Sequence, residues 1–137
     1  MNAYEKAVSL IKIRPHFSGE ITRKLSLRGF AKLDVDEVIN RLTSEGLIND
    51  EQFAQIFLDN LIKYKTFGFY GLKAKLMQRG IPGSDAENLL KINLSLEAEK
   101  EIALRLVERA GEMEKNKLSQ KLSRKGFRSE VIRTVVK

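Results

Sequence analysis

One seven-residue pattern occurs three times in this sequence: Lys-Leu, two variable residues, a basic residue, Gly and a large apolar residue. It is KLSLRGF at 24–30, KLMQRGI at 75–81 and KLSRKGF at 121–127. With the three glycines aligned, apolar residues recur eight and four positions before the glycine and six, nine and ten positions after it, without a gap. These spacings predict a helix that ends at each glycine, a short turn and a second helix.

The residues around each glycine supply helix-end signals. Glycine in the left-handed conformation ends a helix at little steric cost, and an apolar residue just after it usually packs against that helix. The apolar residues here are Phe30, Ile81 and Phe127. Side chains that accept N–H groups of a first turn mark the start of the second helices. They are Asp34 or Asp36, Ser84 or Asp85, and Ser129.

A further helix is predicted before each pair. The three span about 3–13, 50–64 and 96–110, the last two with Asp50 and Ser95 as N-caps. We therefore expect an all-α protein of three tandem three-helix repeats. Their predicted ranges are 1–48, 49–94 and 95–137. Repeats this small bury little apolar surface alone, so we expect them to stack into an elongated, curved body.

Composition excludes several classes of protein. No run approaches the roughly 20 apolar residues of a membrane helix, and charged residues interrupt the N-terminus where a signal peptide would be apolar, so a soluble, cytoplasmic protein is expected. Cysteine is absent, and no metal-ligand spacing or P-loop occurs. His16 has no triad pattern around it and is expected at the surface or in a cap. No enzymatic activity, cofactor or metal is predicted.

Basic residues are concentrated in the helices that end at the glycines. The excess of 25 Lys and Arg over 18 Asp and Glu favours acidic or polyanionic partners. Pairs four residues apart share one helix face: Lys24 and Arg28, Lys75 and Arg79, and Lys121 and Lys125. With them, Lys63, Lys65, Arg124 and Arg128 complete the candidate binding residues. Two interpretations stay open: a face that binds DNA or a nucleoprotein filament, and a solvated face whose charges complement helix dipoles.

An aromatic cluster lies in KYKTFGFYG at 63–71. Its four rings are Tyr64, Phe67, Phe69 and Tyr70. Rings beside lysines suit single-stranded nucleic acid, on whose bases they stack. The alternative is that these rings fill the joint between two repeats, as most aromatic side chains pack in cores.

The order of these motifs resembles a known family. Residues 20–30 match E-[IL]-x-x-K-L-x-x-[RK]-G-F, and residues 38–54 contain RLTSEGLINDEQFA, the most diagnostic stretch. Gly68, Leu72, Leu76 and Gly80 follow at intervals of four, and KLSRKGFRSEVIRTVV ends the chain. Together they resemble the RecX family of recombinase regulators over residues 14–137.

The resemblance implies a cytoplasmic, non-enzymatic bacterial protein of three tandem three-helix repeats. Such a protein binds in the helical groove of the filament that RecA recombinase forms on single-stranded DNA. It thereby suppresses ATP hydrolysis, strand exchange and co-protease activity, which places it in DNA repair, DNA recombination and the SOS response. DNA contact is also attributed to members. Here Gly71 stands where a basic residue is common in the family, and Lys75 where an acid is common.

The leading hypothesis is therefore an inhibitory modulator of RecA filaments. We expect it to act as a monomer, with the RecA filament as partner, single- or double-stranded DNA as a further one, and no membrane. Two alternatives remain. One is a stand-alone DNA-binding helical protein, and the other is a helical-repeat scaffold for protein interactions.

Overall fold

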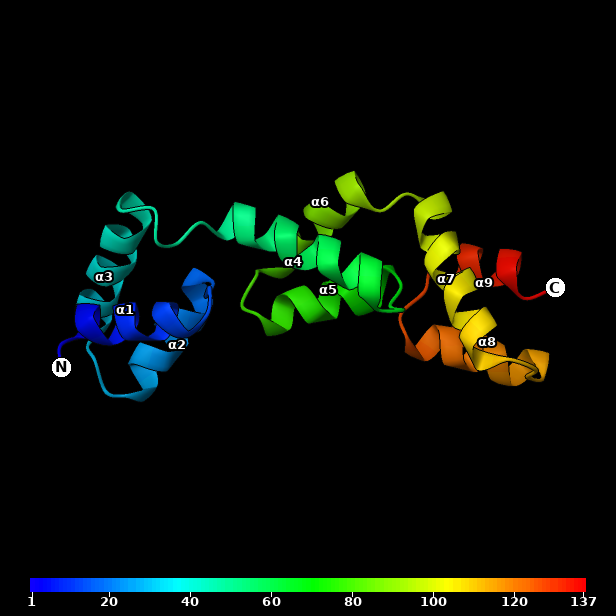
Figure 1. The fold of residues 1–137 in the computed structure, drawn as a ribbon, viewed down its shortest axis with the longest axis horizontal. Coiled ribbons are helices and arrows are strands. Elements are labelled where there is room, and N and C mark those ends of the chain that lie inside the picture. The colour runs from blue at the N-terminus through cyan, green and yellow to red at the C-terminus, as the bar shows by residue number, and fades with distance from the viewer. The chain divides into compact units, whose positions relative to one another are not determined.

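The computed structural model describes residues 1–137 and is built of nine helices without a strand, which confirms the predicted all-α fold. In chain order (Figure 1) they are α1 Ala3–Ile13, α2 Ser18–Leu27, α3 Lys32–Ser44, α4 Asp50–Tyr64, α5 Phe69–Gln78, α6 Gly83–Asn93, α7 Leu96–Ala110, α8 Lys115–Arg124 and α9 Ser129–Val135. The helices predicted at 3–13, 50–64 and 96–110 are confirmed to the residue. None of the nine is long and apolar enough to cross a membrane.

The chain packs as two compact units. The first comprises Met1–Gln55 with Arg79–Ile81, and the second comprises Ile56–Gln78 with Pro82–Lys137. Helix α4 therefore contributes its first residues to one unit and its remainder to the other. The division into three repeats at 1–48, 49–94 and 95–137 stays a prediction.

The first unit is organised around α1, α2 and α3, which all contact one another (Figure 1). Its core combines aligned apolar residues of α2 and α3 with apolar residues of α1, of the last turns of α3 and of the segment after it, because helical spacing places them on one face of each helix. The buried members are Ala3, Ala7, Ile21, Leu25, Val35, Val38, Leu42 and Ile48. Phe17, just before α2, is also buried and meets the ring of Phe53 edge-on, with 6.3 Å between centroids.

The second unit joins α5 to α6, and α9 to both α7 and α8. Its aligned apolar residues Leu72, Leu76, Ala86 and Leu90 are buried on α5 and α6, Leu89 is half-buried, and α8 adds the buried Leu122. The alignment is less accurate at the end of the chain. Leu118 and Ile132 are only half-buried, whereas Val131 beside Ile132 is buried. The short α9 contacts α7 as well as α8.

The three aligned glycines have the backbone conformation that their pattern predicts. Gly29, Gly80 and Gly126 have φ values of 90°, 94° and 83°, in the left-handed region. The residue after two of them closes the cap, since Phe30 N donates to Leu25 O at 3.3 Å and Phe127 N donates to Leu122 O at 3.1 Å. These bonds satisfy carbonyls that a helix end leaves free.

The predicted N-caps fare less well. Ser95 is confirmed, since its hydroxyl accepts the N–H of Ala98 at 3.0 Å. The prediction that Asp50 caps α4 is wrong, because the side chain of Asn49 accepts the N–H of Gln52 at 3.1 Å. The Asp50 carboxylate instead accepts the N–H of Ser18 at 2.8 Å.

The remaining cap predictions are also wrong. Helices α3 and α6 begin at Lys32 and Gly83, before the acids and serine predicted to cap them, and Ser129 is already the first residue of α9. The residues before these three helices make no side-chain cap hydrogen bond. Asp34, Asp36, Ser84 and Asp85 therefore lie within their helices, where an acid can complement the helix dipole.

Candidate nucleic-acid interface

Arg79, one of the ten candidate binding residues, is bound to a buried carboxylate in the first unit. Its guanidinium donates to Glu20 Oε1 at 3.1 Å, and Arg14 donates to Oε2 at 2.9 Å. Glu20 is only 5% exposed, and the N–H of Phe17 also donates to Oε1 at 3.0 Å. Burial by itself raises the pKa of Glu20, but the hydrogen bonds from Arg14, Arg79 and Phe17 outweigh it and lower that pKa to about 2. Arg79 therefore has a structural role here.

Arg128 has the corresponding role in the second unit. Glu99 on α7 is fully buried, and its Oε1 accepts a hydrogen bond from Arg128 Nε. Its Oε2 accepts the backbone N–H groups of Arg128 at 2.9 Å and of Phe69 at 3.0 Å. The guanidinium lies 4.6 Å from the centroid of the Phe69 ring. The carboxylate thus joins the starts of α5 and α9 to α7.

Sequence reasoning missed both buried glutamates, although one signal was present. Glu99 precedes Ile102, Ala103 and Leu106 by three, four and seven residues, so it lies on the apolar face of α7. An acid at such a position must be paired when buried. It therefore predicts a buried cation partner, which proves to be Arg128.

Lys24 and Arg28 lie on α2 and at its C-terminal end. Lys24 Nζ is 3.0 Å from His16 Nε2, and His16 Nδ1 is 2.8 Å from Arg14 O. His16 is only 2% exposed, so of its two expected positions the surface is wrong, whereas its contact with the carbonyl of Arg14, the C-cap residue of α1, agrees with a place in a cap. Burial lowers the pKa of His16, which favours the neutral ring that accepts from Lys24 and donates to Arg14 O. Arg28 is exposed at the C-cap of α2.

The other six candidate residues all belong to the second unit and form no ion pair. They are Lys63, Lys65, Lys75, Lys121, Arg124 and Lys125. Lys75 and Lys125 share one aromatic ring, since their ammonium groups lie 5.0 and 4.1 Å from the centroid of Phe67. The structure therefore brings α5 and the end of α8 together at Phe67.

A pocket of about 430 Å³ lies beside this ring, and we call it the Phe67 pocket. Its lining residues are Leu61, Tyr64, Lys65, Thr66, Phe67, Lys75, Arg109 and Lys125. Arg109 belongs to no repeated pattern and was not a candidate. Like the three lysines, it forms no ion pair, so four cations face this pocket without a carboxylate among the lining residues.

Like charges act on one another around the pocket. The pKa of Lys125 is lowered, first by burial and then by the positive charges of Lys121, Lys75 and Lys65. Repulsion between like charges does not stabilise the folded state. An anion in the pocket would remove it.

Two glycines allow the backbone contact that builds one wall. The N–H of Gly68 donates to Lys125 O, and the N–H of Tyr70 donates to Gly126 O, both at 2.9 Å. A Cβ on Gly71 would lie 2.3 Å from Lys125 O, and one on Gly68 would lie 2.3 Å from Phe127 Cα. No side chain fits between these backbones, so the close approach that sets Phe67 beside Lys125 requires glycine.

Arg105 binds the backbone at the end of α4, beside the lining residues Tyr64 and Lys65. Its guanidinium donates to the carbonyl oxygens of Ile62 at 2.6 Å, Lys63 at 3.0 Å and Lys65 at 2.7 Å. These oxygens are at the C-terminal end of α4, where carbonyls lack helical partners and a cation complements the dipole. The segment that bears Tyr64 and Phe67 is thereby fixed.

The rings of the aromatic cluster differ in exposure. Phe69 is buried at the start of α5 and fills a joint inside the second unit, with its ring against Tyr70 at 5.3 Å. Tyr64 and Tyr70 are 61% and 58% exposed, respectively. Only Tyr64 of these two lines the Phe67 pocket.

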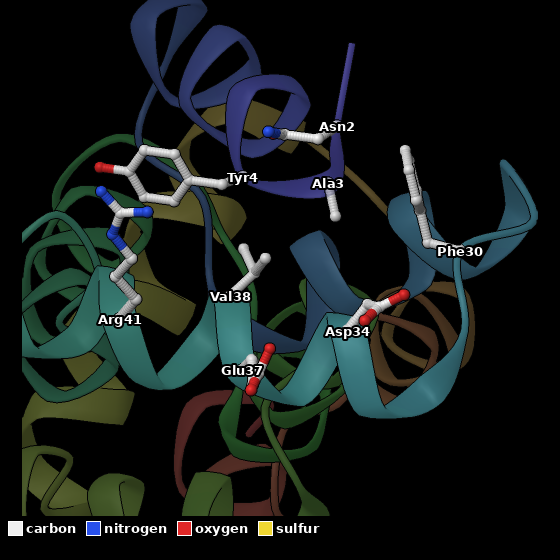
Figure 2. Close-up of a pocket in the computed structure, with 8 residues that line it drawn as sticks. All are labelled: Asn2, Ala3, Tyr4, Phe30, Asp34, Glu37, Val38 and Arg41. Carbon is white, nitrogen blue, oxygen red and sulfur yellow. The ribbon is translucent and has the colours of Figure 1, made fainter.

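A second pocket, in the first unit, has a different character (Figure 2). Arg41 stacks on the Tyr4 ring at 3.6 Å, and the Tyr4 hydroxyl donates to Glu45 at 2.9 Å, so both polar groups are engaged. Asp34 and Glu37 project from α3 on the other side of the pocket in Figure 2. None of the ten candidate basic residues lines it. No cluster of His, Cys, Asp or Glu in the protein has a metal-binding arrangement.

Comparisons with known proteins agree with one another. The family model described as "RecX, first three-helix domain" matches residues 3–42. A regulatory protein RecX from Prosthecochloris aestuarii is 31% identical over 96% of this chain and 89% of its own. One from Chlorobaculum tepidum is 30% identical over 99% of this chain and 87% of its own.

Solved structures give the same result. The crystal structure of RecX from Lactobacillus salivarius matches with a TM-score of 0.85 at 25% identity, over 98% of this chain and 92% of that one. A crystal structure of a regulatory protein RecX matches with a TM-score of 0.79 at 25% identity, over 97% of this chain and 69% of that one. Both structural matches cover nearly the whole chain, whereas the family model matches only residues 3–42.

Proposed function

Because the chain belongs to the RecX family, we propose that it is a non-enzymatic regulator of the RecA recombinase. On this proposal it binds in the groove of the filament that RecA forms on single-stranded DNA. It suppresses ATP hydrolysis, strand exchange and co-protease activity, and so acts in DNA repair, recombination and the SOS response. It works in the cytoplasm, as a monomer built of three repeats.

The main structural support is the set of unpaired cations in the second unit. Lys75 and Lys125 both lie beside the Phe67 ring without an acid to neutralise them, and Lys65 and Arg109 line the same pocket. An anionic partner would explain why charges that repel one another are gathered here without a carboxylate. A nucleoprotein filament is such a partner, since it presents phosphates and acidic side chains along its length.

The direct test is a titration of the protein into RecA on single-stranded DNA, with ATP hydrolysis as the readout. We expect hydrolysis to fall at protein concentrations below that of RecA. The double variant Lys75→Gln, Lys125→Gln should inhibit less. A control with the same charge change, Lys12→Gln with Lys137→Gln, should inhibit as the wild type does, because both lysines are exposed and lie outside the pocket. Unchanged hydrolysis on both growing and preformed filaments would refute the proposal.

A stand-alone DNA-binding protein is the second candidate, and the Phe67 pocket favours it too. The two candidates differ in what happens without RecA. A DNA-binding protein of that kind binds DNA tightly alone, with an affinity that falls steeply with salt, and leaves RecA hydrolysis unchanged once DNA is in excess.

A further inference from the structure

We propose that the Phe67 pocket is a one-nucleotide subsite for single-stranded DNA. Lys75 and Lys125 bind a phosphodiester there, and an unpaired base stacks on the Tyr64 ring. This inference rests on the proposed function, in which a filament on single-stranded DNA is the partner. It goes further in assigning the pocket to the nucleic acid and not to the recombinase.

The first observation is the convergence of cations from separate parts of the chain. Lys75 comes from α5, Arg109 from α7, Lys125 from the turn after α8, and Lys65 from the segment between α4 and α5. All four line one pocket and none has an ion-pair partner. An ammonium group offers three donors and a guanidinium five, so a phosphate placed here has a partner for each oxygen.

The second observation is that the two central lysines are held. Their ammonium groups lie 4.1 and 5.0 Å from the Phe67 centroid, at distances where the ring attracts a cation. Lys75 and Lys125 are also half-buried, whereas Lys121 and Arg124 are exposed. Restricting a lysine before binding reduces the entropy that a contact costs. Phe67 thus positions charge: its ring is half-buried and lies beside two lysines, whereas the Tyr64 ring is 61% exposed and lies beside one, so Tyr64 is the more accessible stacking surface.

The third observation identifies the ligand as nucleic acid. Tyr64 is 61% exposed at the pocket, and Lys63 Nζ lies 5.2 Å from its ring. Arg105 binds the carbonyls on both sides of Tyr64, which fixes this part of the backbone. An exposed, fixed ring beside cations is a stacking platform for a base. An acidic peptide would use the cations and leave the ring unused.

The ligand is further identified as a single strand. Bases in a duplex are covered on both faces by their neighbours, so only an unpaired base can stack on Tyr64. Positive charge also continues beyond the pocket, at the exposed Lys121 and Arg124 of α8. A chain of phosphates uses this continuation, and a free nucleotide does not.

The test of the phosphate contact uses the protein without recombinase. Fluorescence anisotropy measures binding to a labelled oligo(dT) of about 12 nucleotides, within the range of single-strand site sizes, at several salt concentrations. For Lys75→Gln with Lys125→Gln we expect weaker binding and a plot of log K against log salt shallower by about 0.7, because the two lysines neutralise one phosphate of the single strand. The control Lys12→Gln with Lys137→Gln should keep the wild-type slope. Equal slopes for the two double variants would overturn the proposal.

The test of stacking changes a ring without changing charge. Tyr64→Leu should weaken oligo(dT) binding about tenfold and leave the salt slope unaltered, because a stacking contact releases no counterions. Tyr70→Leu is the matched control, since Tyr70 is 58% exposed but lies outside the pocket, and it should bind as the wild type does. If Tyr64→Leu binds as tightly as Tyr70→Leu, the subsite does not exist.

Competition identifies the occupant. Unlabelled oligo(dT) should displace the label, whereas poly-glutamate of equal charge, a nucleoside triphosphate and duplex DNA should displace it only at much higher concentration. Equal displacement by poly-glutamate would assign the pocket to an acidic peptide, and equal displacement by the triphosphate to a free nucleotide, either of which overturns the proposal. Equal, Tyr64-dependent displacement by the duplex also overturns it.

The two proposals fail separately. If the wild type suppresses RecA hydrolysis but the pocket variants bind oligo(dT) normally, the subsite is wrong and the regulatory function stands. If the variants lose oligo(dT) binding as predicted while the wild type leaves RecA hydrolysis unchanged, the regulatory function is wrong and the subsite stands.

Discussion

Replacing Glu99 with alanine tests the joint that supports the Phe67 pocket. The carboxylate is fully buried, and it accepts hydrogen bonds from the Arg128 side chain and from the backbone N–H groups of Arg128 and Phe69. Removing it leaves two buried donors and a guanidinium without their acceptor. Breaking a buried ion pair from one side costs about 3–5 kcal/mol. We therefore expect the free energy of unfolding of the second unit to fall by about 4 kcal/mol, at the middle of that range.

The assay combines denaturant unfolding with amide hydrogen exchange. Urea titration of Glu99→Ala gives the loss of stability, and the amides of Phe69 and Arg128 should exchange faster than others nearby because they lose their acceptor. Glu97→Ala is the matched control. Glu97 is exposed in the first turn of the same helix, where its effect on the helix dipole is about 0.3–1 kcal/mol. A loss for Glu99→Ala no larger than for this control would refute the assigned role of the carboxylate.

Three further predictions concern the first unit, the glycine turns and the Arg105 contacts. The pKa of Glu20 is about 2 in the fold against an ordinary 4.5, so its ionised carboxylate adds at most about 3 kcal/mol to the free energy of unfolding. This stabilisation is present above pH 4.5 and is lost as the pH falls toward 2. Urea titrations should therefore show the stabilities of the wild type and of Glu20→Gln converging between pH 4.5 and pH 2. Gly126→Ala should destabilise far more than Gly29→Ala in thermal melts, because both have positive φ but only at Gly126 would a Cβ lie 2.0 Å from another backbone atom; equal losses would contradict the packing. Arg105→Lys keeps the charge but loses the planar fork, so oligo(dT) anisotropy should show weaker binding at unchanged net charge, and wild-type affinity would exclude a positioning role.

Helix positions were predictable because their signals are local. The helices at 3–13, 50–64 and 96–110 follow from apolar spacing within each segment, and the turns at Gly29 and Gly126 from a backbone conformation that glycine adopts at little cost. N-caps were harder to predict. The carboxylate of Asp50 could accept an N–H group of its own helix or one from elsewhere in the fold. In the structure it accepts the N–H of Ser18, which lies 32 residues earlier in the chain.

The candidate site was predictable only as a list of residue types. In the sequence, Lys75 and Arg79 are equivalent members of a repeated basic pair. In the structure, Arg79 binds Glu20, 59 residues away, while Lys75 is left beside Phe67 without an acid. A long cationic side chain reaches whatever carboxylate the fold brings within range, so spacing along one helix does not tell a structural arginine from an available lysine.

The sequence alone therefore determined the fold class, the family, the glycine turns that end three helices and the excess of positive charge, since these depend on neighbours within a few turns and on composition. Tertiary structure alone decided which charges are neutralised and where the others meet. The Phe67 pocket exists because Gly68 and Gly71 let the start of α5 press against the turn after α8, which brings Lys125 to a ring 58 positions earlier in the chain, since 125 − 67 = 58. Packing between distant segments sets that contact, and no local pattern encodes it.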